Sequence, residues 1–130
     1  MSVKLIIGVP NPFGLWNVGI FTADFFRWAL KAEEAGTIET GEHYFYKVSL
    51  QGLMKYIGPL NSFYFKSLHS CSHDLAIFLG DNRVRNVSFQ DIAGAILDVA
   101  QRIGCEKIYL LDAVVSITHH LLPPRVVSVT

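Results

Sequence analysis

The hydrophobic pattern divides the chain into short apolar runs and longer segments with helical spacing. Residues 3–9 form an apolar run with only two interruptions, which is typical of a strand covered on both faces, as in a parallel sheet. Two prolines and a glycine follow within residues 10–14. They predict a turn, because proline lacks the amide hydrogen that a strand ladder needs.

The next segment predicts a helix over residues 18–32, with Asn17 as its N-cap. Apolar side chains occupy most of the circumference of this helix, so one sheet face cannot cover all of them. Two interpretations stay open: burial between the sheet and later parts of the chain, or contact with another protein chain. Under the second interpretation the candidate interface residues are Phe21, Phe25, Phe26 and Trp28.

The clearest pattern is a strand, a helix and a second strand. Residues 75–79 are continuously apolar, Ser88 with Asp91 resembles a capping box, and the helix that follows carries an apolar stripe. Gly104 predicts the end of this helix as a left-handed cap residue, and residues 107–111 predict the next strand. We expect the two strands to be parallel and joined by a right-handed crossover.

Between the first helix and this unit, residues 36–67 are rich in aromatic and turn-forming residues. Residues 43–48 and 61–66 are strand candidates on either side of a Gly-Pro turn. The sequence therefore predicts a single α/β domain over residues 1–130. Its expected architecture is a mostly parallel central sheet with an antiparallel, aromatic-rich flank.

Composition and charge narrow the classes of partner. The 130 residues are 51% hydrophobic and 17% charged, and 11 basic residues balance 11 acidic ones. Without a positive field the chain is not expected to bind nucleic acid or a membrane surface, and no apolar run approaches the about 18 residues of a membrane span. Two cysteines fit a reducing compartment, so we expect a cytoplasmic protein. Such an apolar, uncharged chain also suggests a surface covered by a subunit or partner.

Polar residues and glycines follow the three predicted parallel strands, where open α/β sheets bind ligands. They are Asn11, Gly14, Asn17 and Gly19 after the first strand, Asp81 after the second and Asp112 after the third. One hypothesis is a nucleoside or nucleotide site at this edge, although the glycines do not form a phosphate-binding motif. The alternative is structural: the glycines permit a turn and close packing, and the aspartates cap loops.

Two further patterns contain residues that could support chemistry. His69, Cys71 and His73 alternate, so in an extended segment they would share one face and could hold zinc; a solvent-exposed loop explains them equally well, and no metal or other cofactor is expected. His119 and His120 are neighbours, which would point to opposite faces of a strand. No serine elbow or activated cysteine is present, so the pattern favours a role other than catalysis.

The order of several short motifs resembles the archaeal proteasome assembly chaperone 2 family. The motifs are Asn17-Val18-Gly19, Leu79-Gly80-Asp81, Ile103-Gly104, Lys107-Ile108-Tyr109-Leu110 and Pro124-Arg125-Val126 with Thr130. The resemblance covers nearly all of this chain but only the amino-terminal part of the family's domain. It implies a three-layer α/β/α domain similar to nucleoside phosphorylases, homo-oligomerisation and, in some members of the family, ATP-independent assistance to the assembly of core proteasome α subunits.

The chain also departs from that family's pattern. It has Asp112-Ala113 where the family usually has paired glycines, and it lacks the tyrosine of the family's carboxy-terminal docking tail. The family's later strands are missing, so the chain is either a piece of a longer domain or a short member whose sheet edge another subunit covers. The leading hypothesis is a protein-interaction module that forms a homo-oligomer; the alternative is the small-molecule site described above.

Overall fold

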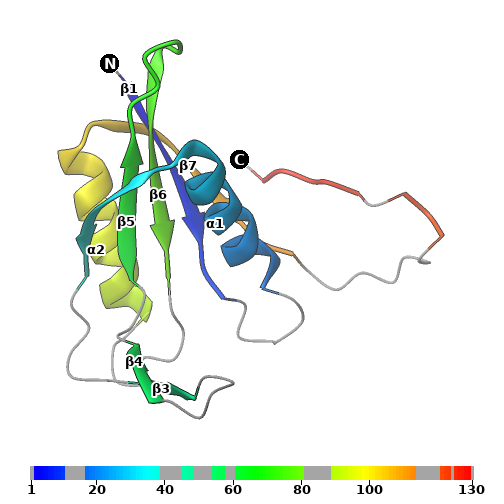
Figure 1. Ribbon diagram of the computed structural model, residues 1–130. Coiled ribbons are helices and arrows are strands. Elements are labelled where there is room, and N and C mark those ends of the chain that lie inside the picture. The colour runs from blue at the N-terminus through cyan, green and yellow to red at the C-terminus, as the bar shows by residue number, and fades with distance from the viewer. Residues whose placement is uncertain are drawn as a thin grey trace.

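A computed structural model describes residues 2–10, 17–38, 45–48, 54–57, 61–80, 89–113, 121–123 and 125–129. The elements in chain order are β1 (Ser2–Gly8), α1 (Val18–Leu30), β2 (Glu33–Thr37), β3 (Phe45–Val48), β4 (Met54–Ile57), β5 (Ser62–Lys66), β6 (His73–Leu79), α2 (Phe89–Arg102) and β7 (Cys105–Leu111). Figure 1 shows their arrangement.

Five of the strands in the described ranges form one mixed sheet in the order β2-β5-β6-β1-β7. Strand β1 pairs in parallel with β6 on one side and with β7 on the other, whereas β5 is antiparallel to both β6 and β2. The two strands of the predicted strand-helix-strand unit are thus parallel to each other, with β1 between them. The prediction of an α/β fold is confirmed.

The sequence predicts two strands of the antiparallel region but not how they pair. The predicted strands 43–48 and 61–66 correspond to β3 and β5, but they do not pair with each other. Strand β3 instead pairs with β4 as a separate two-stranded sheet, and β5 joins the main sheet beside β6. Apolar residues at alternate positions of β5 explain this, because Phe63 packs on Phe78 of β6 with ring centroids 4.8 Å apart.

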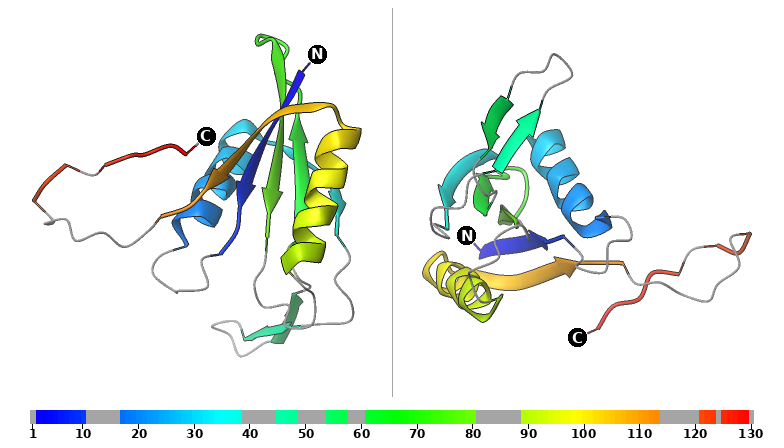
Figure 2. Two further views of the ribbon diagram at one scale, coloured as in Figure 1. Left: turned by 180° about the vertical axis from the view of Figure 1, so that it is seen from behind. Right: turned by 90° about the horizontal axis from the view of Figure 1, so that it is seen from below.

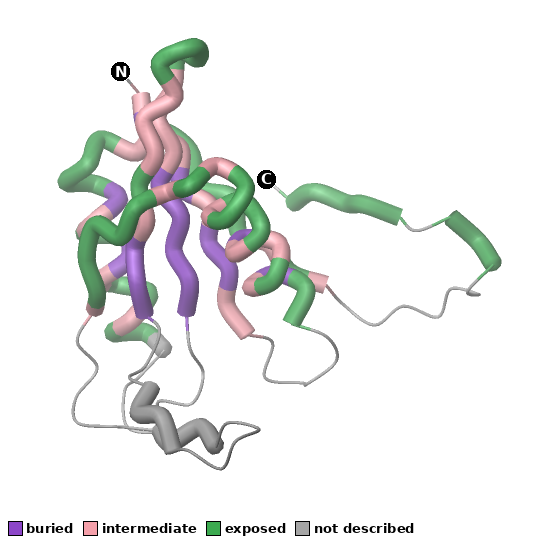
Figure 3. The backbone as a smooth tube through the Cα atoms, in the orientation of Figure 1, coloured by how far each residue is buried: buried purple, intermediate pink, exposed green. Residues whose placement is uncertain are grey.

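The two helices lie against opposite faces of the sheet, as the right-hand view of Figure 2 shows. On one face Ile96 and Ala100 of α2 belong to a buried cluster with Leu5 and Phe78. On the other face Ala23 of α1 packs with Ile77 and the residues around it. Strands alternate their side chains between faces, so neighbouring residues of β1 and β6 supply both clusters. The buried positions follow the middle of the sheet (Figure 3).

The helix ends match the sequence in part. Gly104 has a φ of 67° and follows α2 directly after its last turn, so the predicted left-handed stop is confirmed. Helix α1 is shorter than the predicted 18–32, because Lys31 adopts the left-handed conformation with a φ of 52° and ends it at Leu30. Asn17 is at the N-cap position of α1, as predicted, but its side chain makes no capping hydrogen bond. The predicted side-chain cap is therefore wrong. Ser88 lies outside the described residues.

The predicted apolar stripe of α2 includes residues that are not buried against the sheet. Among the stripe residues whose burial the structure describes, only Ile96 and Ala100 are buried, while Leu97 is 57% exposed. Neither helix in the described ranges has the length and apolar character of a membrane span.

Candidate functional site

Helix α1 contacts the sheet through its smallest residues. Gly19 and Ala23 are its buried residues. A Cβ atom added to Gly8 of β1 would lie 2.5 Å from the Cβ atom of Ala23, and one added to Gly19 would lie 2.1 Å from the carbonyl oxygen of Leu111. The helix and the sheet therefore meet almost backbone to backbone, and no large side chain fits between them at these points.

This close packing directs the large side chains of α1 away from the sheet. Val18, Phe21, Phe25 and Trp28 follow one another at helical spacing and are 43%, 68%, 58% and 72% exposed. Phe26, at 37%, borders them. We call these five residues the α1 aromatic face. Exposed aromatic residues in such a row are unusual on a protein surface that faces only water.

The rings of the α1 aromatic face contact one another. The centroid of Phe25 lies 6.1 Å from that of Phe26 in an edge-to-face arrangement and 6.4 Å from that of Trp28. Aromatic side chains have few rotatable bonds, and mutual contact restricts them further. The contacts therefore restrict the side-chain conformations of Phe25, Phe26 and Trp28.

The exposure of the α1 aromatic face bears on one of the two interpretations left open by the sequence. Burial of the helix between the sheet and later segments is wrong for these side chains in the described part of the chain. Their assignment as interface residues stays a prediction.

A cation–π contact of Arg27 links α1 to the antiparallel part of the sheet, and an ion pair within the helix orients the Arg27 side chain. The Arg27 Nε atom donates to the Asp24 carboxylate at 2.6 Å, and the Arg27 guanidinium lies 5.1 Å from the centre of the Tyr64 ring on β5. The hydrogen bond to Asp24 raises the pKa of Arg27, and burial opposes that rise. Arg27 thus stays charged and links the helix to the sheet.

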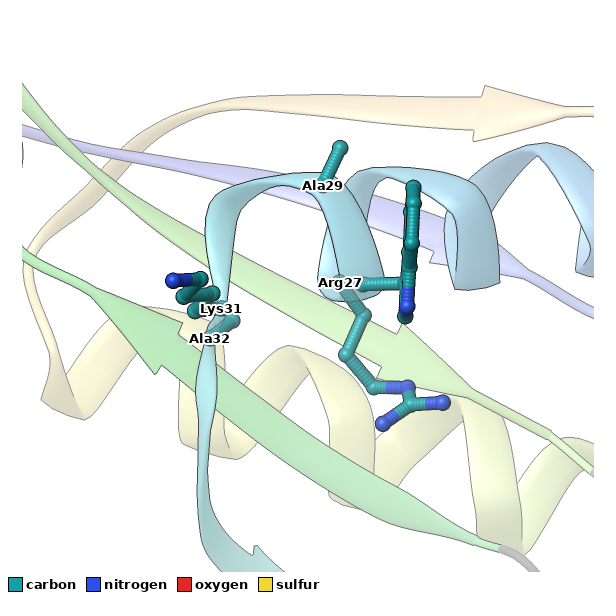
Figure 4. Close-up of a pocket in the computed structure, with 5 residues that line it drawn as sticks. Arg27, Ala29, Lys31 and Ala32 are labelled. Atoms are coloured by element: carbon teal, nitrogen blue, oxygen red, sulfur yellow. The ribbon is translucent and has the colours of Figure 1, made fainter.

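A hollow lies at the carboxyl end of α1, next to the α1 aromatic face. It is lined by Arg27, Trp28, Ala29, Lys31 and Ala32. Figure 4 shows Arg27 reaching from the helix towards the strands and Lys31 beyond the last turn. The apolar face is therefore bordered by two basic groups at this end, an arrangement of apolar centre and charged rim that protein interfaces commonly show.

The predicted strand-end site is assembled only in part. The carboxyl ends of β6, β1 and β7 lie side by side, since Gly8 pairs with both Leu79 and Leu111. Gly19 lies over this edge, but the backbone of Leu111 fills the space in front of it. Asn17 is exposed and Asp112, also exposed, accepts the Ala113 amide at 2.7 Å.

The other members of that prediction, Asn11, Gly14 and Asp81, lie outside the described residues.

The predicted zinc residues are not arranged as the sequence suggested. The extended geometry is wrong, because residues 69–72 form an exposed turn in which the Cys71 amide donates to the Leu68 carbonyl, and β6 begins only at His73. The ring of His73 instead lies 2.7 Å from the Ser2 hydroxyl on the neighbouring strand. No group of three potential ligands gathers anywhere in the described ranges. His119 and His120 lie outside them.

Comparison with known proteins supports the fold. Neither the models of protein families nor the curated proteins give a match to this sequence. The structure is similar to the crystal structure of a PAC2 family protein from Streptomyces avermitilis, with a TM-score of 0.67 and 13% sequence identity. The match covers 92% of this chain and 54% of that protein, so the chain spans about half its length. The chain has a PAC2-like fold.

Sequence reasoning missed the contact residues that create the α1 aromatic face. Gly19 was interpreted as a turn or packing position, and Gly8 and Ala23 were given no role. Their spacing was the available signal: Gly19 and Ala23 are four residues apart and share one side of the helix. The side opposite to such a small-residue stripe is the side that faces outward.

Proposed function

We propose that this chain is a protein-interaction module of the proteasome-assembly-chaperone kind, which binds a protein client through the α1 aromatic face. The observation that carries the proposal is the exposure of four large apolar side chains in one row along α1. Interface centres are enriched in aromatic residues, and burial of one such side chain contributes about 1.5–3 kcal/mol.

Core proteasome α subunits are the proposed clients. The order of motifs along the sequence and the PAC2-like fold both support this choice. In this proposal the chain acts in the cytoplasm as a homo-oligomer and without ATP, as part of a single three-layer domain with an antiparallel, aromatic-rich flank. The α1 aromatic face supplies binding energy directly, so no hydrolysis step is needed to explain its use.

The experiment is an assembly assay with purified α subunits from the same organism. Mass photometry would follow the formation of α rings with and without this protein, and in the presence and absence of ATP. We expect the protein to associate with α subunits before rings form and to increase ring yield equally under both nucleotide conditions. Absence of any complex between this protein and α subunits would contradict the proposed client.

A further inference from the structure

Strand β7 forms one edge of the sheet. It pairs with β1 on its inner side and is the last strand in the order found for the described residues. The outer side therefore presents the backbone donors and acceptors of every second residue. Apolar side chains flank this edge: Leu110 is 65% exposed, and Ile108 and Tyr109 are each 39% exposed.

The segment 125–129 of the same chain is suited to pair with such an edge. Three of its five residues are β-branched valines, which favour strands. Val126, Val127 and Val129 are 97%, 80% and 97% exposed. Within the described ranges it makes no backbone hydrogen bond. Figures 1 and 2 show it as an arm that stands apart from the sheet.

The side chains of the two segments match. Residues of β7 alternate between the sheet faces, and Ile108 and Leu110 lie on the α2 side because they pair with the α2-facing residues of β1. In the segment, Val127 and Val129 also share one face. Pairing that places these two valines beside Ile108 and Leu110 covers all four apolar side chains together.

Charge supports the same pairing. With Val127 opposite Ile108 in a parallel arrangement, Arg125 falls opposite Glu106. With Val127 opposite Leu110 in an antiparallel arrangement, Arg125 falls opposite Asp112. In both directions the one charged residue of the segment meets a carboxylate of β7 or its immediate continuation.

We propose that the 125–129 segment of a second copy of this chain adds as a sixth strand to the outer edge of β7, and that two copies exchange these segments reciprocally. A second copy is the proposed donor because the chain's own segment stands away from its own edge, and because a reciprocal exchange closes two edges with one symmetric contact. The outer face of α1 cannot take this role, since helix backbone groups are already paired within the helix. The inference specifies the homo-oligomer of the proposed function and rests on that part of it.

Disulfide trapping tests the exchange. In a background of Cys71→Ser and Cys105→Ser, one chain carries Val127→Cys and the other carries Ile108→Cys or Leu110→Cys. Mixing the two chains under mild oxidation should give a covalent dimer with one of the two β7 positions. A matched chain with Leu121→Cys, which is 77% exposed and lies outside the segment, should crosslink at least tenfold more slowly.

Sedimentation velocity gives the second readout. The unmodified protein should be dimeric or larger, and Val127→Lys with Val129→Lys should raise the dimer dissociation constant at least tenfold, whereas Leu121→Lys should leave it unchanged. These side chains are exposed, so folding should be unaffected. A strictly monomeric protein, an oligomer insensitive to both valine changes, or a disulfide formed only within a chain carrying both cysteines would overturn the inference. None of these results depends on whether α subunits bind.

Discussion

Gly19 of helix α1 lies directly against the carbonyl group of Leu111 at the end of β7, and a Cβ atom at this glycine would stand 2.1 Å from the carbonyl oxygen. The helix is thereby held at the shortest distance that two backbones allow. Because Gly19 and Ala23 occupy this side of α1, Phe21, Phe25 and Trp28 on the opposite side project outward. The packing of one glycine and the exposure of the α1 aromatic face are two consequences of the same helix orientation.

Replacing this glycine should therefore separate helix and sheet. Gly19→Ala should lower the free energy of unfolding by about 1–3 kcal/mol, since the obstructing atoms belong to the backbone and cannot rotate away. Urea denaturation followed by circular dichroism measures this change.

Gly94→Ala is the matched control for that substitution. Gly94 is also inside a helix, but it is exposed and a Cβ atom there would meet nothing within 4 Å. Alanine should raise the free energy of unfolding by about 0.5–1 kcal/mol through helix propensity. Equal effects at positions 19 and 94 would argue against the close approach of α1 to β7.

The left-handed residue Lys31 offers a second stability prediction. A side chain disfavours this conformation, and glycine adopts it freely, so Lys31→Gly should raise the free energy of unfolding by about 0.5–1 kcal/mol. Gly104→Ala makes the opposite change at the end of α2, where φ is 67°, and should lower stability by about 1 kcal/mol. The urea midpoints should move in opposite directions with unchanged slopes.

The contacts of Arg27 should be measurable as a coupling energy. Arg27→Ala removes both the ion pair with Asp24 and the contact with the Tyr64 ring. We expect a loss of about 0.5–1.5 kcal/mol, because the pair is partly exposed to solvent. A double-mutant cycle with Tyr64→Leu should return a favourable coupling of at least about 0.3 kcal/mol; a coupling of zero would mean that the ring does not hold the helix.

Nucleotides should not stabilise the protein. The space in front of Gly19 is filled by the Leu111 backbone rather than left open for a phosphate. Thermal-shift measurements with nucleosides and nucleotides at millimolar concentration should show a change in Tm below about 1 °C. A larger shift that Asp112→Asn or Asp81→Asn abolishes would instead support the alternative of a ligand site at the strand ends.

The sequence predicts the helices and strands of this fold better than it predicts which strands pair with each other. Periodicity locates β1, β6, α2 and β7, because a strand covered on both faces must be apolar and a helix on a sheet must be amphipathic. It does not predict that β5 joins the main sheet while β3 pairs with β4. That choice depends on contacts such as Phe63 with Phe78, which are distant in the chain.

In the candidate site, too, the features of helix α1 that depend on contacts with distant residues are not predicted by the sequence. The composition of this helix indicates that one sheet face cannot cover all of its apolar side chains, and Phe21, Phe25, Phe26 and Trp28 are exposed in the structure. The spacing of Gly19 and Ala23 marks the side of the helix that faces the sheet, but how closely this side packs depends on distances to β1 and β7. The left-handed Lys31, which ends the helix early, has no signature in the sequence, since glycine or asparagine usually marks such a position.

The central claim is that the α1 aromatic face binds the client, and Phe25 and Leu97 allow a matched test of it. They are 58% and 57% exposed, and each lies on the outer side of a helix, so Phe25→Arg and Leu97→Arg disturb the fold to a similar, small extent. The measurement is the affinity of each variant for purified α subunits by isothermal titration calorimetry. We predict a loss of at least about tenfold for Phe25→Arg and less than about twofold for Leu97→Arg. Equal affinities for both variants and the unmodified protein would contradict the claim.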